Sequence, residues 1–197
     1  QTLDLDSLVF TLKDGFGLEQ DELRQDIFGA KVRLTGDVLY SPWGQWSAGL
    51  QHKRLRNFTV PEAIGARDDS GTDVYFSGSK LFFAALMDRN LLVNLTARGT
   101  RANQGGLLGF GGDRNNRYEW MMEGSAGLFL ERQWLVGAEY RQKPDNLGFA
   151  AENDWWDLFV AWVADRRLAI TAALVNLGDV ATLEDQQGLY LSFQGSF

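Results

Sequence analysis

The chain has 197 residues, a formal net charge of −7 and no cysteine. The lack of cysteine excludes disulfides, thiol nucleophiles and zinc–thiolate sites, and the acidic balance argues against nucleic-acid binding, which needs a basic face. Hydrophobic residues make up 45% of the sequence, yet the mean hydropathy is −0.23. No apolar run approaches the ~20 residues of a membrane-spanning helix, so apolar and polar residues must be interleaved.

Alternation of apolar and polar residues dominates the chain, in pieces of about ten residues, the length of a tilted membrane-spanning strand. The expected strands are residues 2–12, 27–38, 45–54, 72–86, 91–100, 117–130, 134–141, 155–163, 168–177 and 187–197. The polar segment between the first two, residues 13–24, is expected to be a loop or a single helical turn.

Two segments depart from regular alternation. In 72–86, Val74 and Phe76 share one face whereas Leu81 and Phe83 share the other, so we expect a β-bulge near 78–80. The first segment, 2–12, carries two aspartates and is a poor partner for a closing strand. We therefore expect the first strand of the barrel to lie upstream of this chain.

The connections between the expected strands alternate between short and long. Short turns fall at 41–44, 87–90, 131–133 and 164–167, and long loops near 13–26, 55–71, 101–116, 142–154 and 178–186. Outer-membrane barrels have this asymmetry, with short periplasmic turns and longer extracellular loops. The alternating end of the chain, closed by Phe197, is typical of the last strand of such a barrel. We predict a single domain, 1–197, that folds as an all-β, antiparallel, up-and-down transmembrane β-barrel with about ten strands in this chain.

The polar face decides which side of the barrel meets lipid, because a soluble lipocalin-like barrel shows the same alternation with its faces inverted. This face mixes both signs of charge with small uncharged groups, which suits a crowded lumen where buried charges pair. The apolar face carries tryptophans towards the strand ends, as in an aromatic girdle. Lipid bilayer and lipopolysaccharide are therefore the expected partners of the apolar face. The residues expected to line the lumen are Lys31, Arg33, Arg98, Glu119, Glu123, Glu139, Arg141 and Asp157.

Patterns for catalysis or for metal and cofactor binding are weak. His52 is the single histidine, and we expect it to be a solvent-facing rim residue, so no enzyme is predicted. Residues 67–73 (RDDSGTD) offer oxygen ligands for calcium, but the acidic residue at the twelfth position of an EF-hand is absent. Residues 105–113 (GGLLGFGGD) lack the GK[ST] ending of a phosphate loop. We expect no metal and no cofactor.

The glycine-rich loop nevertheless carries Leu107, Leu108 and Phe110, which would be unfavourable if fully exposed. We expect residues 105–112 to fold inward at the barrel mouth as a constriction. Packing of these side chains on a partner or on the rim is the alternative.

The charges of the polar face allow two interpretations. Glu119, Glu123 and Glu139 fall on adjacent expected strands, with Arg98 and Arg141 beside them. Antiparallel neighbours that face one lumen are close enough to pair. The cluster is therefore either a salt-bridged plug that stiffens the barrel or the selectivity lining of a small-solute channel.

Several long motifs carry a family resemblance: DIFGAKVRLTGD, SGTDVYFSGSKLF, TRANQGGLLGFGGD, GAEYRQKPDNLGFAAENDWWDLFVAWV and LYLSFQGSF. From about Gln25 onward the chain resembles a family of proteobacterial proteins of unknown function that are predicted to lie in the outer membrane. The resemblance implies a barrel and its location, but no activity and no site residue. It also implies further alternating segments before the part seen here, which would raise the number of strands to 12–14.

We predict a bacterial outer-membrane protein that acts as a passive, porin-like channel for small solutes. The alternative is a non-conducting barrel that serves a structural or partner-binding role with another outer-membrane or periplasmic protein. A barrel enzyme is disfavoured, because known barrel hydrolases and acyltransferases rely on histidine constellations. Conductance in a planar bilayer would support the channel, and a closed, salt-bridged lumen would count against it.

Overall fold

A computed structural model describes residues 2–12, 21–149, 152–165, 167–180 and 183–195. The strands in this part of the chain are β1 (Thr2–Leu12), β2 (Asp21–Thr35), β3 (Gln45–Leu55), β4 (Ser70–Leu86), β5 (Arg89–Thr100), β6 (Glu119–Phe129), β7 (Trp134–Arg141), β8 (Trp155–Val163), β9 (Leu168–Val180) and β10 (Leu183–Gly195). The helical pieces are α1 (Thr59–Ala63) and the short 3₁₀ turn η1 (Asn103–Gly106). The described residues contain no helix that is long and apolar enough to span a membrane.

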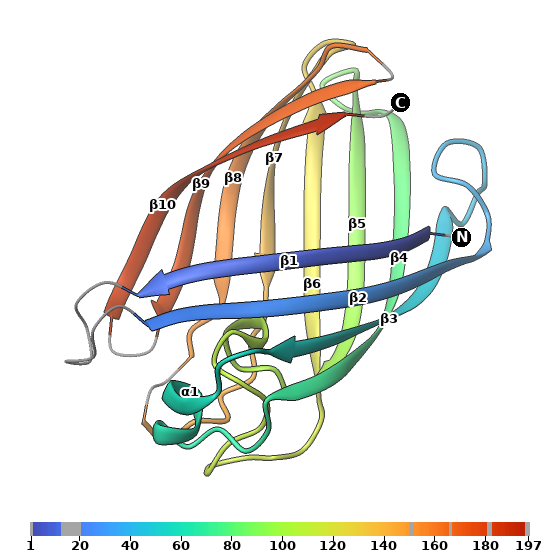
Figure 1. Cartoon of the computed structure of the whole chain (residues 1–197). Coiled ribbons are helices and arrows are strands. Elements are labelled where there is room, and N and C mark those ends of the chain that lie inside the picture. The colour runs from blue at the N-terminus through green and yellow to red at the C-terminus, as the bar shows by residue number, and fades with distance from the viewer. Residues whose placement is uncertain (1, 13–20, 150–151, 166, 181–182, 196–197) are drawn as a thin grey trace.

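The strands form one sheet in which each pairs antiparallel with the next along the chain, in the order β1 to β10. The prediction of an all-β, antiparallel, up-and-down fold is confirmed. Figure 1 shows that the sheet curls strongly, so that β1 and β2 pass in front of β4 to β8. Within the described residues no pairing joins β1 to β10, so the sheet has two open edges and a closed barrel is not shown.

Several boundaries differ from the prediction, because backbone pairing extends strands beyond their apolar residues. β2 begins at Asp21, where polar residues pair with β1, so residues 21–24 are not a loop; residues 13–20 lie outside the described part. β9 and β10 extend to Val180 and from Leu183, so the long loop expected near 178–186 is largely strand. Residues 196–197 of the expected closing strand also lie outside the described part.

The expected bulge near 78–80 is wrong. β4 pairs without interruption with β5 from Val74 to Phe82, and the register shift falls between Phe82 and Leu86. Ala84 lies in this shift with a φ of +48°. Phe83 is exposed while Leu81 is buried, which places the irregularity beside the turn rather than in mid-strand. At that turn Met87 and Asp88 both have positive φ, the conformation of a tight two-residue hairpin.

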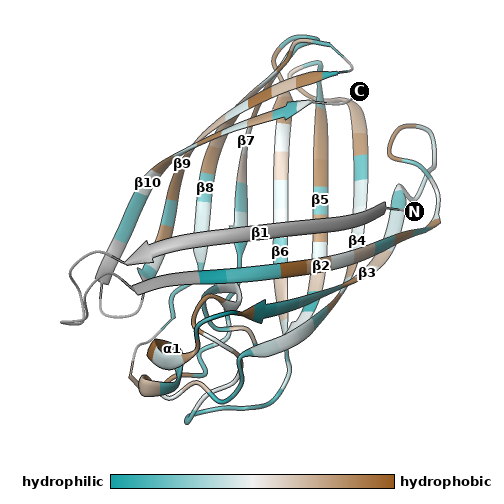
Figure 2. Ribbon diagram, viewed as in Figure 1, coloured by the Kyte–Doolittle hydropathy of each residue, from teal (hydrophilic) through white to brown (hydrophobic). Residues whose placement is uncertain are grey.

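The two faces of the sheet differ in an unusual way: the polar face is buried and the apolar face is exposed. We call the polar face the inner face and the apolar face the outer face. Buried polar residues of the inner face include Gln25, Ser47, Lys53, Asp73, Ser77, Thr96 and Asp157. Exposed apolar residues of the outer face include Phe28, Leu50, Phe76, Leu95, Trp120, Met122, Trp156, Leu158, Leu174 and Phe193. Figure 2 shows the resulting alternation of hydrophilic and hydrophobic residues along the strands.

The loops at one end of the sheet pack together into a cap, which we define as residues 56–69, 101–116 and 142–149 (Figure 1). Its small apolar core consists of Ile64, Ala66, Leu108 and Leu147, with Phe58 against it. The cap therefore joins the connections β3–β4, β5–β6 and β7–β8, which the sequence predicts as long loops.

Candidate functional site

A row of charged side chains crosses the inner face next to the cap, with one residue from each strand from β3 to β7. Its members are Lys53, Asp73, Arg98, Glu123 and Arg141. Neighbouring strands bring them together because same-face residues that are opposite or diagonal in antiparallel pairs lie within side-chain reach. Glu123 and Arg141, for example, are directly opposite in the register of β6 and β7. We call this row of side chains the charge ladder.

Arg98 lies at the centre of the charge ladder. Its Nε and Nη2 donate to the two carboxylate oxygens of Glu123, at 2.7 and 3.3 Å, and its Nη1 donates to Gln51 at 2.9 Å. The guanidinium also lies 5.1 Å from the ring centroid of Tyr75. Two-pronged guanidinium–carboxylate contact of this kind fixes orientation as well as charge. Glu123 is shared, because Arg141 Nε lies 3.2 Å from its Oε1.

Asp73 connects the charge ladder to the cap. Lys53 Nζ donates to Asp73 at 2.7 Å, and Thr100 Oγ1 donates to its other oxygen at 2.5 Å. The same Lys53 amine donates to the carbonyl oxygen of Gly105 at 3.0 Å. A residue of η1 in the cap is thus held by the inner face of β3.

The cap also contacts β9, which lies far from β3 in the strand order of the sheet. Gln104 donates through its side-chain amide to the carbonyl of Asp179 on β9, at 2.8 Å. Lys143 Nζ donates to Gln104 Oε1 and to the carbonyl of Leu177, at 3.2 and 3.0 Å. Together with the Gly105–Lys53 bond, these contacts make η1 a bridge from β3 to β9 across the capped end of the sheet.

Two asparagines and an aromatic ring hold the cap in shape. Asn103 and Asn146 are fully buried and are joined by a side-chain hydrogen bond of 2.9 Å. Phe110 is fully buried and exchanges backbone hydrogen bonds with Asp68, at 3.0 and 3.1 Å. A Cβ at Gly71 would overlap the Phe110 ring, so the ring needs a glycine beneath it. Leu108 is buried with these residues, and Leu107 is half-buried.

Glu152 lies between the cap and the sheet in an environment that disfavours its charge. It is buried, and its two oxygens accept hydrogen bonds from the backbone N–H of Gln104, at 3.1 and 3.0 Å. Burial raises its pKa to about 7, while these hydrogen bonds and nearby Lys143 act in the opposite direction. Burial likewise lowers the pKa of Lys143.

The raised pKa of Glu152 predicts that the cap loosens as pH rises. When the cap opens, Glu152 regains its ordinary pKa of 4.5, so the closed form binds the proton more tightly, with a pKa of about 7. The stabilisation is fully present below pH 4.5 and is lost as pH rises to about 7, by an amount on the order of 3 kcal/mol. Amide exchange of residues 103–111, corrected for intrinsic exchange rates, measures this opening free energy.

The control for this prediction is the exposed Glu62 of α1. E152Q should abolish the pH dependence of cap opening, whereas E62Q should leave it intact. An opening free energy in the wild type that does not change between pH 4.5 and 7 would contradict the prediction.

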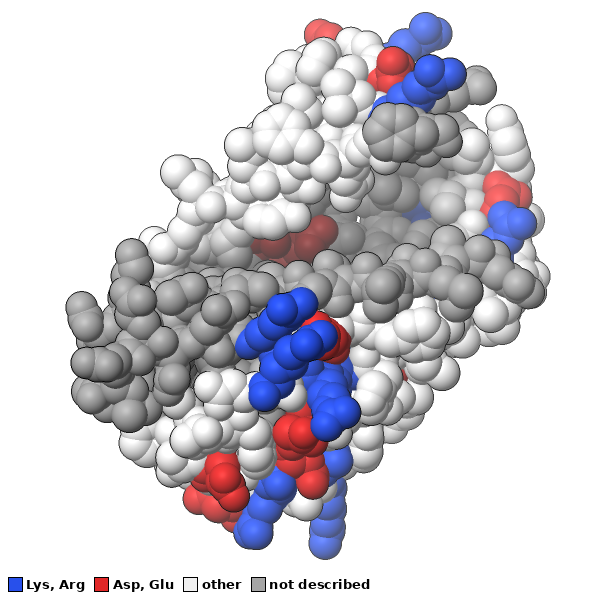
Figure 3. All heavy atoms as spheres, viewed as in Figure 1, with Lys and Arg blue, Asp and Glu red and all other residues white. Residues whose placement is uncertain are grey.

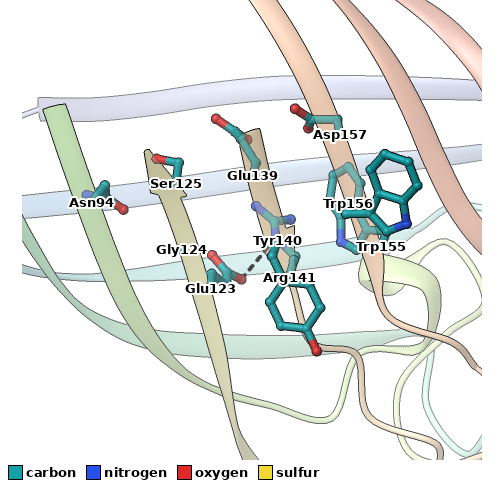
Figure 4. Close-up of a pocket in the computed structure, with 10 residues that line it drawn as sticks. All are labelled: Asn94, Glu123, Gly124, Ser125, Glu139, Tyr140, Arg141, Trp155, Trp156 and Asp157. Atoms are coloured by element: carbon teal, nitrogen blue, oxygen red, sulfur yellow. Dashed lines mark ion pairs between the residues drawn. The ribbon is translucent and has the colours of Figure 1, made fainter. Parts of the chain in front are cut away.

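Two further carboxylates face the interior beside the charge ladder. Glu139 and Asp157 are directly opposite in the register of β7 and β8. They line a cavity of about 110 Å³ together with Glu123, Ser125 and Arg141. Figure 4 shows both carboxylates on the same side of this cavity, and the Glu123–Arg141 ion pair below them. Figure 3 shows an acidic patch recessed in the surface of the molecule, away from the charges near the two ends.

The structure places the sequence-predicted residues in three groups. Arg98, Glu123 and Arg141 are joined in the charge ladder, and Glu139 and Asp157 lie beside it. The residues that take no part in the ladder are Lys31 and Arg33 on β2 and Glu119 at the start of β6. His52 is exposed on the outer face and bonds Thr72 Oγ1 through Nδ1 at 2.9 Å.

Sequence reasoning missed Lys53 and Asp73, although their parity marks the inner face. Lys53 continues the alternation of Ser47 and Gln51, and Asp73 continues that of Tyr75. Asp73 was assigned to the acidic segment 67–73, whose aspartates instead pair separately: Asp68 with Arg101, Asp69 with Arg54 and Asp73 with Lys53. The bridge made by Gln104 and Glu152 has no sequence signal, because it joins loops without periodicity.

Residues 1–194 match the family described as "Protein of unknown function (DUF3034)". The chain therefore belongs to that family, and the match begins at the first residue rather than near residue 25. No curated protein and no solved structure matches the chain.

Proposed function

We propose that this member of the DUF3034 family is a bacterial outer-membrane β-barrel that acts as a narrow channel for small solutes, with the cap over one mouth. The observation that carries the proposal is the inverted burial of the sheet, with polar residues inside and large apolar residues outside. Water disfavours such an outer face, whereas hydrocarbon favours it. In β6, β7 and β8 every outer-face position is uncharged.

The outer face also suits a bilayer at its edges. Trp120, Trp134 and Trp156 are exposed near strand ends, where indole rings favour the headgroup region. Closure of the sheet, by pairing of β1 with β10 or with strands outside this chain, is part of the proposal, because a membrane leaves no unpaired strand edge. Lipopolysaccharide is the proposed neighbour on the side of the cap, where the long loops lie.

The interior favours passage of small solutes only. The cavity beside the charge ladder shares Ser125, Glu139 and Asp157 with a second cavity of about 280 Å³. The two spaces lie next to one another along the inner face, and the charge ladder and η1 narrow the capped end.

A non-conducting barrel is the second candidate, and the bridge of η1 from β3 to β9 favours it. Planar-bilayer recording distinguishes the two. We expect small conductance for the wild type and larger conductance for Q104G, which removes the contacts of the Gln104 side chain with β9 and Lys143. Glycine also suits the φ of +47° at this position. Q133G, in a turn at the opposite end of the sheet, is the matched control and should conduct like the wild type.

Silence of both the wild type and Q104G in the bilayer would overturn the channel and leave the non-conducting barrel. Membrane location is tested separately by fractionation of bacterial envelopes and by gel mobility before and after boiling. A protein that stays in solution without detergent would overturn the whole proposal.

A further inference from the structure

Glu139 and Asp157 differ from Asp73 and Glu123, the two acids of the charge ladder, because no ion pair joins them to a described lysine or arginine. Arg141 follows Glu139 on the same face of β7, two residues along the strand. Its Nε lies 3.2 Å from Oε1 of Glu123 instead. The two carboxylates are nevertheless direct cross-strand partners. Like charges in that position repel one another unless a cation lies between them.

Asp157 also has an unsatisfied oxygen. The residue is only 8% exposed, and its Oδ1 has no hydrogen-bond partner among the described residues. A buried carboxylate oxygen without a partner is unfavourable, so its presence points to a donor supplied from outside the chain. The residue lines both interior cavities, so a ligand in either space would meet it.

The two cavities differ in chemical character on either side of these carboxylates. The smaller one, of about 110 Å³, has charged side chains in its lining, among them Glu123 and Arg141 of the charge ladder. The larger one, of about 280 Å³, is lined mainly by apolar side chains, including Leu135, Phe159 and Ala173. A ligand held at Glu139 and Asp157 therefore has room for an apolar body on one side.

We propose that Glu139 and Asp157 bind an organic ammonium ion whose apolar body lies against Leu135 and Phe159. An ammonium group carries donors and a positive charge, which match the unpaired oxygen of Asp157 and the facing carboxylate. A bare metal ion fits less well, because the described residues contain no cluster of three or more metal-ligating acids, histidines or cysteines. The apolar wall would also offer it no ligand. The site depends on the inner face alone and does not require the interior to conduct.

The test is calorimetric titration of the full chain in detergent with n-butylammonium, against a protein-free micelle blank. Saturable binding is expected for n-butylammonium, and none for butyrate or n-butanol at the same concentrations. D157N should weaken binding about tenfold or more, because it replaces a charged acceptor, and E139Q should weaken it as well. F159A should reduce the preference for butylammonium over methylammonium while methylammonium binding persists.

E119Q is the matched control, since Glu119 is an inner-face acid of β6 that lines neither cavity. It should bind butylammonium like the wild type. Equal affinities of the wild type and folded D157N, or equal binding of butanol and butylammonium, would overturn the site. If D157N does not fold, E139Q takes its place, because Glu139 is exposed and Asp157 is buried. An affinity of E139Q for butylammonium equal to that of the wild type would then overturn the site.

Discussion

Replacement of Arg98 by methionine is expected to lower the free energy of unfolding by about 3–5 kcal/mol, because it leaves buried carboxylates without their central cation. Arg98 and Glu123 have side chains only 14% and 12% exposed, and the guanidinium also serves Gln51 and Asp73. Methionine keeps much of the volume, so the loss reports on charge and hydrogen bonding rather than on a cavity. Urea unfolding in detergent micelles, followed by tryptophan fluorescence, measures it.

The double variant R98M/E123Q makes the interpretation specific. Removal of both charges should restore part of the lost stability, so the double variant should be less destabilised than the sum of the single variants. R33M is the matched control, because Arg33 is exposed on β2 and outside the charge ladder, and it should change stability by about 0.5 kcal/mol at most. Additive losses in the double variant would show that the ladder does not act as a unit.

The cap should be most sensitive at Phe110. F110A is expected to lower the free energy of cap opening by about 3–5 kcal/mol, since the ring is fully buried and Gly71 beside it has no side chain to fill the space. Hydrogen exchange of residues 101–111 should therefore accelerate strongly while the amides of β6 and β7 stay protected. If the channel proposal holds, the same variant should also conduct more than the wild type.

Phe149 supplies the matched control for this substitution, because it belongs to the same cap and is 52% exposed. F149A should leave the exchange of residues 101–111 close to that of the wild type. Acceleration of the whole sheet in F110A would mean that cap and sheet unfold together, and the cap would then not be a separate unit.

Most of the strands could be predicted from alternation, because one face of each strand is apolar and the other is polar. β7 and β8 begin and end at the predicted residues. Prediction was poorer where pairing does not depend on apolar side chains, as in the polar start of β2 and in β10 before residue 187. The bulge was misplaced because a change of parity shows that a strand is irregular but not where the register shifts.

The site was predicted in part for the same reason. Parity alone brings Arg98, Glu123 and Arg141 to one face, and their pairing then follows from the strand order. The role of Asp73 was not predicted, because its acidic neighbours are typical of a loop. The role of Glu152 was not predicted, because contacts between loops leave no periodic pattern in the sequence. The apolar residues of the glycine-rich loop show a related limit. The sequence indicates that these residues are covered, but not that Ile64 and Leu147 from other loops cover Leu108.

The sequence by itself determined the alternation of faces and the uncharged outer positions of β6 to β8, since these depend on residue type and on the two-residue period of a strand. The short turns between expected strands indicated the antiparallel order. Only the tertiary structure decided which charges meet, which acids remain unpaired and where the loops pack. Those outcomes depend on register and on contacts between segments far apart in the chain. Glu139 and Asp157 are an example. The alternation of the sequence indicates that each is an inner-face acid, but only the register of β7 and β8 makes them direct cross-strand partners.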